Sequence, residues 1–376
     1  MASIVKAYDP EELKLRGTPI TVVTTPEQDI TRKDYNDLVK LLPDRKVGLV
    51  MGSVKKYSDD VQVVTLDSIH HIDPDSIGIL ITDECHCASS EGRTDMLLRA
   101  SRAARWGVSA TPDGRYDGRD LVTEGLFGPV VYRRSYQQGV ADGALVPINV
   151  CWLEIPEPDM GLDKYLRYKT RAGKYRNGLY RNECHNSIVA EVLRHIDPAI
   201  HQTLCIMPHI DQMSQIIRLC PDVRYVHAKT STDALADEQC RNLQGVSTAE
   251  RRAIYEGMAD GTIRKIVSTH VYKQGVNFPQ LSIVLNAGGG GSEIAAKQIP
   301  GRESRRIDDS YGKECSYLVD FRHTWDTETN KQNRVVPGPI LKDDISREKY
   351  YSSLGFNQTW YKSVDELPFL MGGQIT

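Results

Sequence analysis

Short runs of apolar and β-branched residues alternate with amphipathic stretches along the first part of the chain. The stretches at residues 30–42 and 96–104 have the spacing of helices. Strands that are apolar along their whole length are typical of parallel sheets with helices on both faces. We therefore expect an α/β fold with strands at residues 20–24, 47–51, 61–65, 77–81 and 106–109.

The second part of the chain repeats this alternation. Strands are expected at residues 203–207, 223–227, 265–269, 283–286 and 314–321, with helices at 186–195, 210–220 and 248–260. Between the two parts, apolar runs at 126–132 and 146–153 predict strands at a domain junction, and a basic, tyrosine-rich stretch follows at 165–175. The repeated pattern predicts two similar lobes, each a mostly parallel sheet with helices on both faces, and a cleft between them.

These patterns divide the chain into four parts. We expect a first lobe over residues 1–150, an inter-lobe connection over 151–185, a second lobe over 186–345 and a C-terminal tail over 346–376. The prolines at 156 and 158 mark the start of the connection.

Composition is that of an ordinary globular protein. Lysine and arginine number 47 and aspartate and glutamate 50, so the net charge is −3. This balance neither indicates nor excludes nucleic-acid binding, because a strand needs a local basic groove rather than a basic average. The eight cysteines include no C-x-x-C pair, which disfavours a zinc site formed by Cys85, Cys87, Cys184 and His185.

Two adjacent carboxylates, Asp83 and Glu84, stand just after the apolar run 77–81. Adjacent carboxylates at the carboxyl end of a buried strand are what an NTPase uses to hold Mg²⁺, through water, and to activate the attacking water. The alternative is an acidic loop that ends an ordinary strand. The apolar strand before the pair and His86 after it favour the first interpretation.

Three further segments carry residues suited to the same chemistry. Ser109 and Thr111 follow the next expected strand, a loop with Gly275 follows the strand ending near Thr269, and Arg302 and Arg305 are three residues apart. Two arginines at this spacing lie on one face of a helix and can reach a γ-phosphate. Taken singly, each segment is also compatible with a turn, a loop or a solvated basic helix.

In order and spacing, these segments together resemble the core motifs of superfamily 2 helicases. The correspondence assigns motif Ia to residues 22–26, motif Ib or Ic to 63–67, motif II to 83–86, motif III to 109–111, motif IV to 204–208, motif V to 269–279 and motif VI to 298–305. Residues 127–132 and 139–147 are similar to the end of the first lobe in phage UvsW-like and restriction-enzyme-like members. The resemblance covers nearly the whole chain.

The resemblance implies two RecA-like lobes, with ATP between them and a nucleic-acid strand running across both. It implies that Asp83 and Glu84 serve metal and water and that Arg302 and Arg305 are arginine fingers. The remaining nucleotide-site positions it implies are His86, Ser109, Thr111, Gly275, Asn277 and Gln298. Thr25, Thr65 and Thr269 would hydrogen-bond phosphates of the strand, which fixes register without reading sequence.

One element of the family is missing from the sequence, the phosphate-binding loop G-x-x-x-x-G-K-[ST]. Gly-Lys occurs only at 173–174 and 312–313, and neither pair is followed by serine or threonine. Residues 1–7 resemble the end of the helix that follows this loop in the family, so the first lobe is expected to be incomplete. Asn277 is a second departure, because the family often has aspartate there.

Three explanations of the missing loop are open. The gene is split or its start is misplaced, with the loop upstream or on a separate polypeptide; the chain is a fragment that binds nucleic acid without ATP turnover; or ATP binds in a way the sequence does not reveal. We favour the first, because Asp83, Glu84, Arg302 and Arg305 have no shared use without hydrolysis.

The function expected is an ATP- and Mg²⁺-dependent helicase or translocase core acting on DNA or RNA, with DNA favoured and a phage origin considered. The alternative is a non-catalytic nucleic-acid-binding module. No secretory signal is present and no apolar stretch approaches the ~20 residues of a membrane span, so we expect no membrane partner. The expected location is the cytoplasm, which is that of the bacterial host if the gene is a phage gene.

Overall fold

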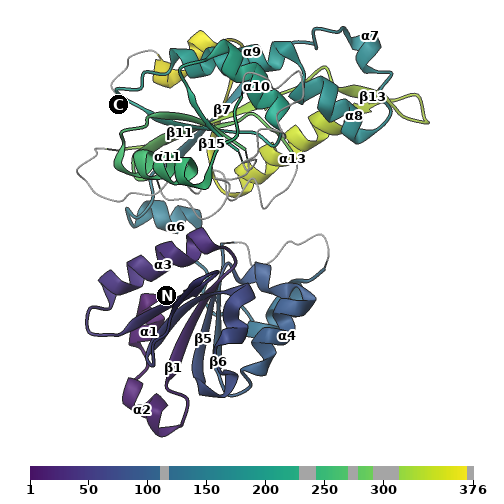
Figure 1. Ribbon diagram of the computed structural model, residues 1–376. Helices are drawn as coiled ribbons and strands as arrows, with labels where there is room; N and C mark the ends of the chain where they lie inside the picture. Colours follow the sequence, from purple (N-terminus) through teal and green to yellow (C-terminus); the bar gives the residue numbers. More distant parts are fainter. Residues whose placement is uncertain (111–117, 228–242, 270–277, 291–312, 371–376) are drawn as a thin grey trace. The chain divides into compact units, whose positions relative to one another are not determined.

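The computed structural model describes residues 1–110, 118–227, 243–269, 278–290 and 313–370. Contacts divide the chain into two compact units, Met1–Arg133 and the residues from Arg134 onward. Each unit contains its own sheet and its own core (Figure 1). The two units are therefore described separately.

The sheet of the first unit has the strand order β3-β2-β4-β1-β5-β6 among the described residues. All neighbouring strands are parallel except β3, which returns antiparallel to β2. The strands are β1 (Ile20–Thr25), β2 (Val47–Met51), β3 (Val54–Lys56), β4 (Val61–Thr65), β5 (Ile77–Asp83) and β6 (Ala104–Val108).

Helices cover both faces of this sheet. Successive side chains of each buried strand point to opposite faces, and the apolar side chains on both faces are buried beneath helices. Val23 and Ile81 pack with one core cluster, to which Leu38 of α3 belongs. Val22 and Leu80 pack with the other, which includes α4 and α5. The helices are α1 (Ala2–Lys6), α2 (Pro10–Leu15), α3 (Gln28–Leu41), α4 (Glu91–Arg99) and α5 (Asp120–Phe127), and Figure 1 shows α3 and α4 on opposite sides of the sheet.

The sheet of the second unit is parallel throughout its described strands, in the order β15-β7-β12-β11-β8-β10-β9. The strands are β7 (Ile148–Glu154), β8 (Gln202–Ile206), β9 (Arg224–Val226), β10 (Lys265–Ser268), β11 (Leu281–Asn286), β12 (Ser316–Arg322) and β15 (Asn357–Tyr361). A small antiparallel hairpin, β13 (Thr327–Thr329) and β14 (Val335–Pro337), follows β12.

Helices also cover both faces of the second sheet. One face packs against α9 and α10, and the other against α11 and α13 (Figure 1). The helices of this unit are α6 (Tyr136–Ala141), α7 (Leu162–Tyr165), α8 (Arg171–Tyr175), α9 (Glu183–His195), α10 (Ile210–Leu219), α11 (Thr248–Asp260) and α13 (Pro339–Ser353). Across the described segments, no helix is both long enough and apolar enough to cross a membrane.

The two-lobe α/β architecture expected from the sequence is confirmed, but several local expectations differ from the structure. The unit boundary lies at Arg133 rather than at residue 150, because α6 and β7 pack with the second sheet. The stretch expected as a tail supplies a whole strand, β15. The strand expected at 126–132 is wrong: α5 ends at Phe127, and Val131 is 80% exposed with no ladder partner among the described residues.

Candidate functional site

The expected site residues of the first unit lie at one edge of its sheet. In the strand register, Thr25 is opposite Thr65, and Asp83 is opposite Val108. Because β1, β4, β5 and β6 are parallel, their carboxyl ends share this edge. The structure therefore brings Thr25, Thr65, Asp83 and Ser109 to the same side of the sheet.

Glu84 has an unusual backbone at this edge. Its φ and ψ are both 47°, the left-handed conformation, and it is followed by the 3₁₀ turn Cys85–Ser89. A residue that has a Cβ adopts this backbone conformation at a free-energy cost of about 1–2 kcal/mol. Strained non-glycine residues concentrate at functional sites. The turn thus redirects the chain immediately after the last carboxylate of β5.

His86 connects this turn to the end of β6. Its side chain is buried, with Nδ1 2.9 Å from Ser109 Oγ and 3.5 Å from Glu84 Oε2. One imidazole therefore contacts both the acidic turn and the segment after the neighbouring strand. Among the described residues, Ser109 is the residue through which the segment after β6 contacts the acidic turn.

Asp34 is a site residue that the sequence interpretation missed. It lies on α3, is 3% exposed, and its Oδ2 has no hydrogen-bond partner among the described residues. Burial, followed by the negative charge of Asp83, raises the pKa of Asp34 to about 7. A signal was available, because Asp34 stands four residues from both Ile30 and Leu38 on the buried face of the helix.

Cys85 is a packing residue rather than a nucleophile. Burial and the neighbouring charges of Glu84 and Asp83 raise the pKa of its thiol to about 12, so the thiolate is scarce at neutral pH. A Cβ at Gly107 would lie 2.9 Å from Cys85 Sγ. Only glycine therefore fits on β6 beside this side chain.

The threonines expected to contact a nucleic-acid strand are held by local hydrogen bonds. Thr25 is fully buried and its hydroxyl pairs with that of Thr31, while Thr65 donates to Ser68 Oγ at 2.8 Å. In the second unit, Thr269 follows β10 and its amide donates to Val226 O at 3.0 Å. These contacts stabilise the segments that leave the sheet edges.

Six expected site residues lie outside the described residues. They are Thr111, Gly275, Asn277, Gln298, Arg302 and Arg305. The elements that flank them are described: β10 and β11 enclose the segment with Gly275 and Asn277, and the strand ends of β11 and β12 flank the segment with the two arginines.

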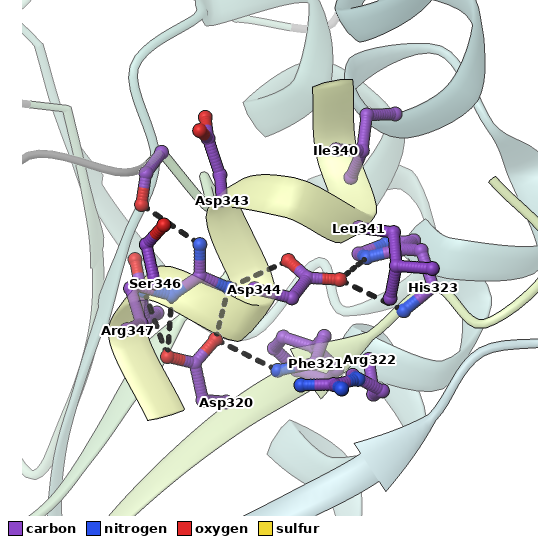
Figure 2. Close-up of polar contacts among 12 residues, drawn as sticks. Asp320, Phe321, Arg322, His323, Ile340, Leu341, Asp343, Asp344, Ser346 and Arg347 are labelled. Carbon is purple, nitrogen blue, oxygen red and sulfur yellow. Dashed lines mark hydrogen bonds and ion pairs between the residues drawn. The ribbon is translucent and has the colours of Figure 1, made fainter. Parts of the chain in front are cut away.

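A buried charge network lies at the carboxyl ends of β11 and β12 (Figure 2). Arg347 of α13 is 2% exposed and forms ion pairs with Asp320 at 2.8 Å and with Asp344 at 2.9 Å. It also donates to Gly290 O at 2.8 Å. Arg347 thus ties α13 to β12 and to the last described residue before the segment 291–312.

A pair of histidines extends this network into the core. His323 Nδ1 lies 3.0 Å from Asp344 Oδ2, and its Nε2 lies 3.2 Å from Nδ1 of His185. The other ring nitrogen of His185, Nε2, lies 3.0 Å from Ala287 O. Burial and the neighbouring His323 lower the pKa of His185 to about 3. Although burial opposes its ionisation, Asp344 has a pKa below its usual range because of His323 and Arg347.

The sequence interpretation missed this network because its members are far apart in the chain and belong partly to the presumed tail. The hydrogen bonds to Ala287 and Gly290 position the end of β11, from which the segment with Gln298, Arg302 and Arg305 continues. Within the described residues, no group of three or more metal-ligating side chains is present.

Two family models match the chain. The SWI2/SNF2 ATPase model matches residues 6–154, and the model of the helicase conserved C-terminal domain matches residues 198–306. The first match covers the unit with Asp83 and Glu84. The second includes the segments expected to carry the strand contact at Thr269 and the two arginines.

Two relatives and one solved structure illustrate the similarity. The DNA 3'-5' translocase XPB2 of Sulfurisphaera tokodaii is 24% identical over 77% of this chain and 70% of its own length. The protein named "Putative helicase 22" of Sulfolobus islandicus filamentous virus is 26% identical over 66% of this chain but only 43% of its own length. Dbp5 of S. cerevisiae, solved with RNA and ADP BeF3, superposes with a TM-score of 0.60 at 13% identity, covering 95% of this chain and 80% of that chain.

Proposed function

Because this chain belongs to the superfamily 2 helicases and has their two RecA-like lobes, we propose that it is the core of an ATP-dependent DNA translocase or helicase. Hydrolysis at residues of the first lobe would be coupled to movement along a strand. DNA is chosen over RNA because XPB2, a relative that matches 77% of this chain, is a DNA translocase.

The observation that carries the proposal is the arrangement around β5. Asp83 ends the strand, Glu84 is held in a strained left-handed conformation, and His86 joins Glu84 to Ser109. If this loop had only a structural role, glycine at position 84 would adopt the same backbone conformation without the free-energy cost that a residue with a Cβ incurs.

The donor set at this edge fits Mg²⁺. Carboxylate oxygens are the ligands that Mg²⁺ prefers, together with retained water. Burial is the main cause of the raised pKa of Asp34, and the negative charge of Asp83 adds to it; a divalent cation beside Asp83 would offset that second contribution. A bound Mg²⁺ would neutralise charge on the β- and γ-phosphates of ATP.

Each residue has a distinct role in this proposal. Asp83 would hold Mg²⁺ through water, Glu84 would accept the proton of the attacking water, and His86 with Ser109 would relay the state of the turn to the neighbouring strand. Arg302 and Arg305 act as arginine fingers. The other nucleotide-site residues proposed are Thr111, Gly275, Asn277 and Gln298, and the proposed strand contacts are Thr25, Thr65 and Thr269.

A phosphate cradle is the remaining requirement. We propose that a segment with the G-x-x-x-x-G-K-[ST] pattern, upstream of residue 1 or on a separate polypeptide, supplies it. A second candidate function, nucleic-acid binding without ATP turnover, is favoured by one observation: the sequence itself contains no such pattern.

The test is DNA-stimulated ATP hydrolysis by the chain joined to a P-loop segment, compared with its Glu84→Gln variant. We expect Glu84→Gln to reduce the rate by about 10²–10⁴-fold, the usual contribution of a general base. Glu91→Gln is the matched control, because Glu91 is an exposed carboxylate at the start of α4. No hydrolysis by the joined protein, together with retained DNA binding, would support the second candidate.

A further inference from the structure

Residues 161–181 and 324–337 form a small separate layer on the second unit, which we call the basic cap. Its interior is aromatic: Tyr165, Tyr175 and Leu179 pack with Trp325 and Ile340. The rings of Tyr165 and Trp325 meet edge to face, with centroids 4.9 Å apart. Figure 1 shows the cap elements α7, α8 and β13 grouped beside α13. The basic, tyrosine-rich stretch of the sequence is therefore a folded element.

Buried carboxylates hold the cap in place. Asp326 accepts hydrogen bonds from Tyr165 Oη at 2.8 Å and from the amides of Ile340 and Leu341, and Lys174 Nζ lies 3.9 Å from it. Because Lys174 is itself buried and pairs with Glu328, the charges inside the cap are satisfied. Asp343 of α13 likewise accepts from Tyr175 and pairs with Arg171.

The outer surface of the cap keeps a positive excess. Residues 161–181 contain seven lysines and arginines and one aspartate, whereas the whole chain has a net charge of −3. Six of the basic side chains of the cap are exposed and have no acidic partner among the described residues: Lys164, Arg167, Lys169, Arg176, Lys331 and Arg334. Exposed cations without acidic partners give the cap a local positive charge, which suits its surface to a polyanion.

The cap lies at the carboxyl edge of the second sheet. A Cβ at Gly289, just after β11, would lie 3.0 Å from Leu179 Cδ1 of the cap. The ring of Tyr180 is 4.2 Å from that of His209, which follows β8. Thr269, the proposed strand contact of this unit, follows β10 at the same edge. The cap, through Leu179 and Tyr180, is therefore next to the edge at which the strand is proposed to bind.

We propose that the basic cap is a second nucleic-acid contact, which binds the phosphate backbone of the strand outside the helicase motifs. This inference rests on the proposed function, and extends it by a surface to which no motif contributes. Exposed lysines and arginines bind phosphates by releasing condensed counterions, so their contribution is independent of sequence and sensitive to salt.

The experiment compares the full-length chain with a variant in which Lys164, Arg167, Lys169 and Arg176 are changed to glutamine. Fluorescence anisotropy with a labelled single-stranded oligonucleotide, at several salt concentrations, gives the affinity and its salt slope. We expect the variant to bind about tenfold or more weakly at low salt, with a slope of log K against log salt shallower by about 2–3. The matched control changes Arg194, Arg224, Lys349 and Lys362 to glutamine, which removes the same number of charges from exposed positions on the same unit outside the cap.

The outcomes separate this inference from the proposed function. If the unchanged chain binds the oligonucleotide and the cap variant, with an unchanged melting temperature, binds equally well, the cap is not a contact and the proposed function stands. An equal loss in the control variant would attribute binding to net charge and would also overturn the inference. If the unchanged chain binds no nucleic acid at all, both the cap contact and the proposed function fail.

Discussion

Glu84 is the residue whose backbone and side chain make opposite demands. Its left-handed conformation favours glycine, while the proposed chemistry needs its carboxylate. We expect the free energy of unfolding of Glu84→Gly to be about 1 kcal/mol higher than that of Glu84→Ala, because only alanine retains the Cβ that strains this backbone conformation. At Asp95, exposed within α4, the order should reverse, since glycine weakens a helix by about 1 kcal/mol relative to alanine. Urea denaturation of the four variants checks both signs.

Asp34 predicts a pH dependence of stability. With a folded pKa near 7 against an ordinary value of 3.8, the folded protein binds more protons than the unfolded chain between those pH values. This carboxyl group therefore lowers the free energy of unfolding as the pH rises through that window, by up to about 4 kcal/mol. The variant Asp34→Asn has no carboxyl group at this position and does not lose this stability. The difference between its melting temperature and that of the unchanged protein should therefore become more positive from pH 5 to pH 8. A constant difference across this range would contradict the assignment.

Among the elements, α13 depends most on charge for its attachment. Arg347→Met would leave Asp320 and Asp344 without their cation in the core, which costs about 3–5 kcal/mol. Arg322→Met on β12 removes a partly exposed pair with Glu348 and should cost about 1 kcal/mol or less. Guanidinium denaturation distinguishes the two variants, and equal losses would show that the buried network contributes no more to stability than the partly exposed pair.

The strands that the sequence predicts are those buried on both faces. The runs at β1, β4 and β5 are apolar because each side of the sheet carries helices. β15 escaped prediction because it is an edge strand with half-exposed polar residues, and only its pairing with β7 makes it a strand. The strand predicted at 126–132 was wrong because apolar residues form a strand only where a neighbouring strand receives their hydrogen bonds.

The same distinction holds for the candidate site. The proximity of Asp83, His86 and Ser109 follows from parallel strand ends, which a sequence pattern can reveal. Asp34 lies on a helix and is influenced by the charge of Asp83, and His185 contacts His323 across more than a hundred residues of sequence. The spacing of Asp34 along α3 indicates that it is buried, but which groups it and the histidines face depends on how the elements pack together, and no local pattern encodes that packing.

For the whole molecule, the division into two units predicts where a protease cuts. Residues 128–135 have no regular structure and are exposed, and the connection includes Arg133 and Arg134. We expect limited trypsin digestion to release a fragment ending at one of these arginines, because exposed irregular connections are preferred cleavage sites. Mass spectrometry identifies the fragment, and Arg133→Gln combined with Arg134→Gln should abolish it.

The position of β7 in its sheet has a consequence for synthesis. Its two neighbours, β12 and β15, both come from the last part of the chain. While the ribosome extends the polypeptide, the strands of the first unit can pair early, but the apolar β7 emerges without either neighbour. Until residues 316–361 have been made, β7 has no strand to pair with, so its apolar side chains stay exposed in the nascent chain and favour aggregation.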